Sequence, residues 1–174
     1  METVSYVLSL VATALGLVEP FSKRMRTVLI LSFIGNFLIA VSYFCVHGYS
    51  GAAICGVACI QLAINYTFTS RGKKIPIPLI IAYAVSFILV NLLTFKELYD
   101  IIALIASLNF VLSVAQSEAK YYRILYIINA MLWMTYDVFA SAYGNLFTHG
   151  VIFVGTGIAI FVRNRNKKAE KKEA

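Results

Sequence analysis

Residues 27–46 read TVLILSFIGNFLIAVSYFCV, an apolar run of 20 residues without a charged side chain. An α-helix rises about 1.5 Å per residue, so about 20 apolar residues cross a hydrocarbon core about 30 Å thick. Working outward, six further apolar runs of similar length occupy residues 3–18, 50–69, 76–95, 98–116, 123–142 and 145–162. The sequence therefore predicts an all-α membrane protein with seven transmembrane helices.

The composition agrees with a protein whose surface faces lipid. Hydrophobic residues make up 60% of the chain and charged residues 13%, with a mean hydropathy of +0.81. A soluble domain carries about 25% charged residues. The net charge is +7, but the basic residues lie in short gaps between apolar runs rather than on one patch. We therefore expect the lipid bilayer, and no nucleic acid, as a partner.

The basic residues also predict the orientation of the chain. Seven crossings place every lysine and arginine except Lys96 on one side of the membrane. Basic loops remain cytoplasmic, which predicts an N-terminus outside and a C-terminus inside. The residues concerned are Lys23, Arg24, Arg26, Arg71, Lys73, Lys74, Lys120, Arg123, Arg163, Arg165, Lys167, Lys168, Lys171 and Lys172.

A repeat is visible when the chain is shifted by about 93 residues, which maps the first three predicted helices onto the last three. The shift pairs Ile34 with Ile127, Asn36 with Asn129, Tyr43 with Tyr136, and Gly51 with Gly144. We expect two parallel three-helix bundles, residues 1–74 and 97–163, joined by a connector helix in residues 75–96. Residues 164–174 form a basic tail. Parallel repeats of this kind build some transporters, with the solute between the halves.

Residues 32–36, 47–51 and 65–71, and residues 128–133 and 161–163 in the second half, resemble the YgjV family of bacterial inner membrane proteins. The 3+1+3 plan resembles, more broadly, the SWEET and PQ-loop group of sugar and small-solute carriers. One departure is Glu19-Pro20 in place of a Pro-Gln pair after the first helix. The resemblance implies a multi-pass protein of the bacterial inner (plasma) membrane that carries a sugar or another polar metabolite.

The repeat indicates a candidate solute site. Asn36 and Asn129 occupy equivalent places in the second and sixth predicted helices, and each lies seven residues before a tyrosine, Tyr43 or Tyr136. Trp133 shares that helix face in the second repeat. Amides that donate and accept, beside rings that stack, suit a polyhydroxylated or flat aromatic solute. The alternative is that the asparagines only join helices by hydrogen bonds.

Further polar residues lie within the predicted spans. Gln61 and Asn65, one turn apart in the third helix, are substrate-binding candidates or structural hydrogen-bonding groups. Asp137 is an acid well inside the sixth span, where an isolated carboxylate is costly. Its candidate roles are proton coupling, solute binding, or a buried pair with a tyrosine or His149.

Glu19 is expected at the cytoplasmic edge of the membrane near Lys23, where it can form a salt bridge. Cys45, Cys55 and Cys59 have no metal-ligand spacing, and two histidines without clustered acids or thiols do not indicate a metal.

Catalytic motifs are missing from the sequence: it has no Gly-rich phosphate loop, no H-E-x-x-H pair and no G-x-S-x-G elbow. We expect neither an enzyme nor a cofactor. A small-solute carrier is the leading hypothesis, and a non-transporting scaffold, sensor or assembly protein is the alternative. The sequence does not decide between a monomer and a homo-oligomer.

Overall fold

The computed structural model describes residues 2–45, 49–95, 97–139 and 143–173, and it is helical nearly throughout. The described part holds seven α-helices and one 3-10 turn, one helix for each predicted span. Their bounds are α1 Glu2–Val18, η1 Glu19–Phe21, α2 Met25–Cys45, α3 Tyr49–Ser70, α4 Ile77–Thr94, α5 Asp100–Val114, α6 Ala119–Phe139 and α7 Tyr143–Glu173. The predicted all-α class is confirmed.

The turn between α3 and α4 follows from glycine and proline chemistry. Gly72 has a φ of 66°, which a glycine adopts without steric cost. Its N–H donates to the Thr69 carbonyl at 3.1 Å, and the Lys73 N–H donates to the Phe68 carbonyl at 3.0 Å. This is the Schellman pattern that ends helices. Pro76 then caps α4, so the chain reverses within a few residues.

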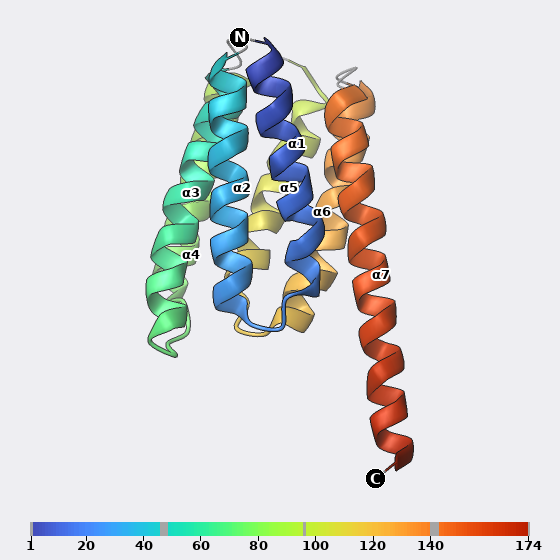
Figure 1. Cartoon of the computed structure of the whole chain (residues 1–174). Helices are drawn as coiled ribbons and strands as arrows, with labels where there is room; N and C mark the ends of the chain where they lie inside the picture. The colour runs from blue at the N-terminus through green and yellow to red at the C-terminus, as the bar shows by residue number, and fades with distance from the viewer. Residues whose placement is uncertain (1, 46–48, 96, 140–142, 174) are drawn as a thin grey trace.

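The helices run alternately up and down, and neighbours in the chain are neighbours in space (Figure 1). A further contact between α1 and α7 closes the order into a ring. The α1–α2, α3–α4 and α5–α6 linkers and the end of α7 all lie at the end opposite the N-terminus. We call it the basic end, because these segments carry almost all the lysines and arginines. The predicted tail is the helical continuation of α7 beyond the bundle.

Four of the described helices are long and apolar enough to cross a membrane, and large apolar side chains cover the outside. The candidate spans are Met25–Ser42, Ala52–Ser70, Ile77–Thr94 and Leu146–Arg165. Leu10 is 72% exposed and Leu93 is 87% exposed, which suits contact with lipid. Crossings by α1, α5 and α6 remain a prediction. Helices α1 and α5 are shorter than the four candidate spans. Helix α6 carries three charged residues, Lys120, Arg123 and Asp137.

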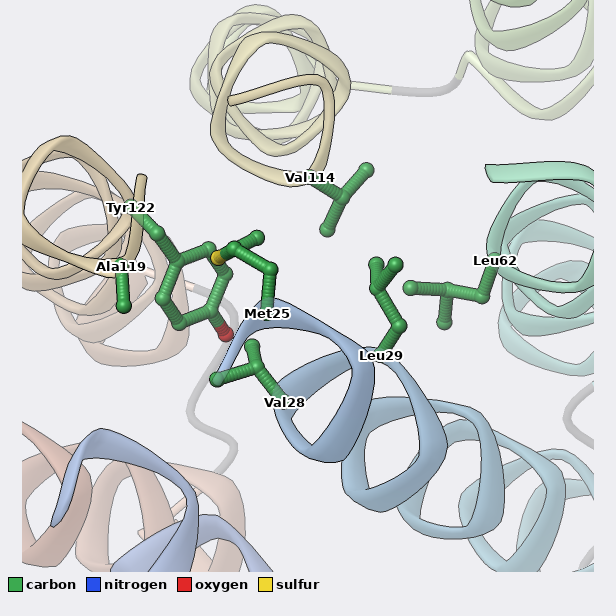
Figure 2. Packing of buried hydrophobic residues seen from close by; sticks show 7 residues of the cluster. All are labelled: Met25, Val28, Leu29, Leu62, Val114, Ala119 and Tyr122. Carbon is green, nitrogen blue, oxygen red and sulfur yellow. The ribbon is translucent and has the colours of Figure 1, made fainter. Parts of the chain in front are cut away.

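The apolar cluster with the most buried residues joins the first and second halves of the chain toward the basic end. Figure 2 shows its side chains converging from α2, α3, α5 and α6. Its buried members are Met25, Val28, Leu29, Leu62, Val114, Ala119 and Tyr122. A second cluster packs α4 against α3 and α5. Because α4 contacts both neighbours, the division into two three-helix bundles with a connector stays a prediction.

Candidate functional site

A carboxylate and an imidazole meet between α6 and α7. Asp137 is 1% exposed, and its Oδ2 lies 2.6 Å from Nδ1 of His149. The side chain of His149 is about a quarter exposed, so the pair reaches the edge of the packed interior. Of the roles considered for Asp137, the structure shows the pairing with His149. A buried carboxylate requires such a partner, because an uncompensated charge in low dielectric is costly.

A series of aromatic rings extends from the histidine of this pair. The ring of Trp133 stacks on that of His149, with centroids 5.8 Å apart and planes 15° apart. Tyr136 meets Trp133 edge-to-face at 5.6 Å. Tyr99, just before α5, meets Tyr136 at 5.7 Å. The structure therefore brings three predicted residues, Trp133, Tyr136 and Asp137, into one place. We call these five residues the aromatic–acid cluster.

A line of hydroxyl groups runs along α1. Ser5 and Ser9 each share a hydrogen bond with Ser42 of α2, at 2.6 and 2.9 Å. Thr13, one turn further, lies 3.3 Å from the hydroxyl of Thr148 on α7, beside the histidine of the pair. We call these five residues the hydroxyl seam. The hydroxyl seam was not predicted from the sequence, although the four-residue spacing of the α1 hydroxyls marks one helix face.

The two repeat-related asparagines have different partners. Asn129 is buried and donates its amide N–H to the Ala106 carbonyl of α5 at 2.6 Å. Asn36 is half-buried and donates to the Ser32 carbonyl of its own helix at 2.9 Å. No described hydrogen bond joins the two amides. The side chain of Tyr43 lies outside the described residues. The hydrogen bond of Asn129 therefore joins two helices, whereas that of Asn36 lies within α2.

Gln61 and Asn65 link α3 to α5. Gln61 donates to the Val111 carbonyl at 3.4 Å, and Asn65 donates to the Val114 carbonyl at 3.0 Å. Both side chains are fully buried, and their amide oxygens have no protein partner in the structure. A buried acceptor left unpaired costs about 1–3 kcal/mol. Each oxygen is therefore suited to accept a hydrogen bond from water or from a solute hydroxyl.

The expected salt bridge between Glu19 and Lys23 is not present in the structure. Glu19 is 3% exposed, whereas Lys23 is exposed, and the structure shows no ion pair between them. The turn η1 directs the carboxylate inward, where it accepts hydrogen bonds from the hydroxyls of Ser32 and Tyr122. Tyr122 is 103 residues away in the chain. A partner so distant in the chain leaves no signal in the sequence around Glu19.

Comparison with known proteins adds a family. A family model described as "Bacterial inner membrane protein", the YgjV family, matches residues 3–167. The chain belongs to the YgjV family. No curated protein and no solved structure matches it. Together with the apolar helices, membership identifies a membrane protein of the bacterial inner membrane. The broader grouping with SWEET and PQ-loop carriers stays a prediction.

In this YgjV-family chain the candidate site lies mainly on α6 and α7, with the hydroxyl seam beside it on α1 and α2. The structure gathers Trp133, Tyr136 and Asp137, and it adds Tyr99 and His149 to them. The described part of the chain contains no group of three or more histidine, cysteine, aspartate or glutamate residues that could hold a metal. The chemistry available is proton exchange, hydrogen bonding and ring stacking.

Proposed function

We propose that this YgjV-family protein is a small-solute carrier of the inner membrane, for a sugar or another polar metabolite. The observation that carries the proposal is the buried pair of Asp137 and His149. Ionisable residues inside a membrane bundle are rare and usually functional. Stability alone does not explain such a pair, because well-packed apolar residues of similar volume often stabilise a protein as much.

The proposed pathway runs between the two halves of the chain. It is lined by the hydroxyl seam, by Asn36 and Asn129, and by the aromatic–acid cluster. In the proposed topology the chain crosses the membrane seven times with the basic end in the cytoplasm. The apolar cluster of Figure 2 then forms the closed cytoplasmic side of the pathway. The SWEET-like plan of two parallel repeats is part of this proposal.

The solute class follows from the side chains available. Hydroxyl and amide groups both donate and accept hydrogen bonds, as recognition of a polyol requires. Trp133 and Tyr136 offer flat apolar faces for a sugar ring or a planar heterocycle. Gln61 and Asn65 add buried acceptors nearer the basic end.

The pair also offers a means of coupling to protons. A carboxyl group and an imidazole joined by a hydrogen bond can share a proton, because each can act as donor or acceptor. Asp100, at the start of α5, forms a hydrogen bond with Tyr136, so a second carboxylate adjoins the cluster. We propose that protonation of this group accompanies solute movement.

Uptake into proteoliposomes tests the carrier. Purified protein is reconstituted with an imposed proton gradient and offered labelled sugars, nucleosides, amino acids and vitamins. We expect at least one polar solute to accumulate faster than in protein-free liposomes. Asp137→Asn should abolish the dependence on the gradient, whereas Glu118→Gln, which replaces an exposed acid directly before the same helix, should not. Equal uptake with and without protein across the whole panel contradicts the proposal.

A non-transporting membrane scaffold is the second candidate. It is favoured by the amides of Asn129, Gln61 and Asn65, which all donate to backbone carbonyls of α5. Under this alternative, substitution of these amides lowers thermal stability and no solute protects the protein against unfolding. Protection by a solute in the same melting assay favours the carrier.

A further inference from the structure

The basic end holds a buried carboxylate that the proposed function does not use. Glu19 begins η1, where α1 has ended and the chain turns toward α2. Its Oε1 accepts a hydrogen bond from Ser32 Oγ of α2 at 2.7 Å and another from the hydroxyl of Tyr122 of α6. One oxygen atom thus joins η1 to α2 in the first half of the chain and to α6 in the second half. We call Glu19, Ser32 and Tyr122 the carboxylate latch.

The cation beside the latch is engaged elsewhere. Arg123 is 3% exposed, and its guanidinium donates to the backbone carbonyls of Pro20 and Ser22. Among the described residues, Asp137 and His149 form a contact within ion-pair distance, and Glu19 forms none. The carboxyl group is therefore buried with two O–H donors and without a countercharge within ion-pair distance.

The remaining neighbours do not supply that charge. Tyr126 of α6 stacks on Tyr122 at 5.1 Å and lies close enough to respond to the charge of Glu19. Arg163 of α7 lies near enough to Arg123 to oppose its charge. From α2 the latch receives only the Ser32 hydroxyl. The nearby basic residues Lys23, Arg24 and Arg26 are exposed.

Glu19 lies in η1, between α1 and α2 and beyond the predicted first span of residues 3–18. Burial raises the pKa of Glu19 to about 8, and the hydrogen bond from Ser32 offsets part of that rise. The side chain is therefore a neutral acid at pH 6 and mostly an anion at pH 9. An anion in this site has no cation within ion-pair distance, and hydration would stabilise it.

We propose that Glu19 is a proton-binding site that fastens the turn between α1 and α2 to α6, and that loss of its proton to water releases the turn. The bound proton keeps the carboxyl neutral, so it stays inside with its two O–H donors. Release requires the turn to move outward until water reaches the carboxylate. This latch holds whether or not the protein carries a solute.

Hydrogen exchange of the full chain in lipid nanodiscs tests the latch. Wild type, Glu19→Gln and the exposed control Glu118→Gln are compared at pH 4 and again at pH 9, so the intrinsic exchange rate cancels at each pH. In the released turn water restores the ordinary glutamate pKa of about 4.3, so ionisation favours release increasingly from about pH 4 up to the raised pKa of the buried group. At pH 9, backbone amides of residues 21–28 should exchange more than about a hundredfold faster in wild type and in Glu118→Gln than in Glu19→Gln. The three proteins should exchange within about twofold of one another at pH 4.

Equal exchange by wild type and Glu19→Gln at pH 9 overturns the proposal. A second pair of variants covers the case in which Glu19→Gln does not fold. Tyr122→Phe removes one O–H donor, whereas Tyr121→Phe removes an exposed hydroxyl one residue away. Tyr122→Phe should speed exchange of the turn about fivefold at pH 6, and Tyr121→Phe should leave it unchanged. Identical exchange in these two variants also overturns the latch.

Discussion

Asp137 of α6 and His149 of α7 lie 2.6 Å apart, which is hydrogen-bond distance between the carboxyl Oδ2 and the imidazole Nδ1. The carboxylate is almost fully buried while the imidazole is partly exposed. The carboxyl group of Asp137 thus lies among the packed helices, and the imidazole of His149 lies at their edge.

The stability of this pair can be tested by removing one partner. His149→Ala leaves the Asp137 carboxylate buried without its partner, and we expect the free energy of unfolding to fall by about 3 kcal/mol. Thermal melting in lipid nanodiscs measures the loss. Replacing both residues by leucine should recover most of it, because neither charge remains. A double variant as unstable as His149→Ala would contradict the pairing.

The two repeat-related asparagines should respond differently to truncation. Asn129→Ala breaks a bond between α5 and α6, so the free energy of unfolding should fall by about 0.6 kcal/mol or more. Asn36→Ala removes only a bond within α2 and should change stability less. If Asn36 contacts solute, its loss weakens solute binding by about 1–3 kcal/mol. Equal loss of stability in both variants, with solute binding unchanged, indicates two purely structural amides.

The packing of α1 against α7 depends on a glycine. A Cβ on Gly155 would lie 2.6 Å from Cδ2 of Leu17, whereas a Cβ on Gly35 of α2 would meet nothing within 4 Å. Gly155→Val should therefore lower the free energy of unfolding by about 1–3 kcal/mol. Gly35→Val, the matched control, should change it far less. Similar melting of the two variants would show that Leu17 moves aside freely.

Topology is tested by labelling from each side of the membrane. Leu98 is 81% exposed at the N-terminal end, and Lys73 lies in the basic α3–α4 turn. With the three native cysteines replaced by alanine, Leu98→Cys should react with an impermeant maleimide added outside. Lys73→Cys should react only after the membrane is opened, and a reporter fused after Ala174 should read as cytoplasmic. Reaction of Lys73→Cys from outside reverses the orientation.

The helices could be predicted because their signals are local. An apolar run of fixed length, a glycine at 72 and a proline at 76 define α3, the turn and α4 without reference to the rest of the chain. The same local reading placed all seven helices. It could not establish the order in which helices pack, because apolar surfaces pair with little specificity.

The site was predicted in part. Trp133, Tyr136 and Asp137 share one stretch of α6, so their grouping follows from helical spacing. The partners from other elements, Tyr99 and the α1 hydroxyls, depend on tertiary packing and were missed. A salt bridge of Glu19 with Lys23 was expected because the two are close in sequence. In the structure Glu19 is buried and instead accepts a hydrogen bond from Tyr122, on a helix distant in the chain. Equivalent positions of Asn36 and Asn129 in the repeat did not give them equivalent bonds.

The contact between α1 and α7 has a consequence for connectivity. Each other neighbouring pair around the ring is joined directly by a short linker, which limits how far its two helices can part. Between α1 and α7 lies the whole intervening chain, so no short tether limits their separation. If the bundle opens sideways into the bilayer, α1 and α7 can therefore separate without stretching the backbone. Their separation would expose the hydrogen-bonded hydroxyls of Thr13 and Thr148 to lipid.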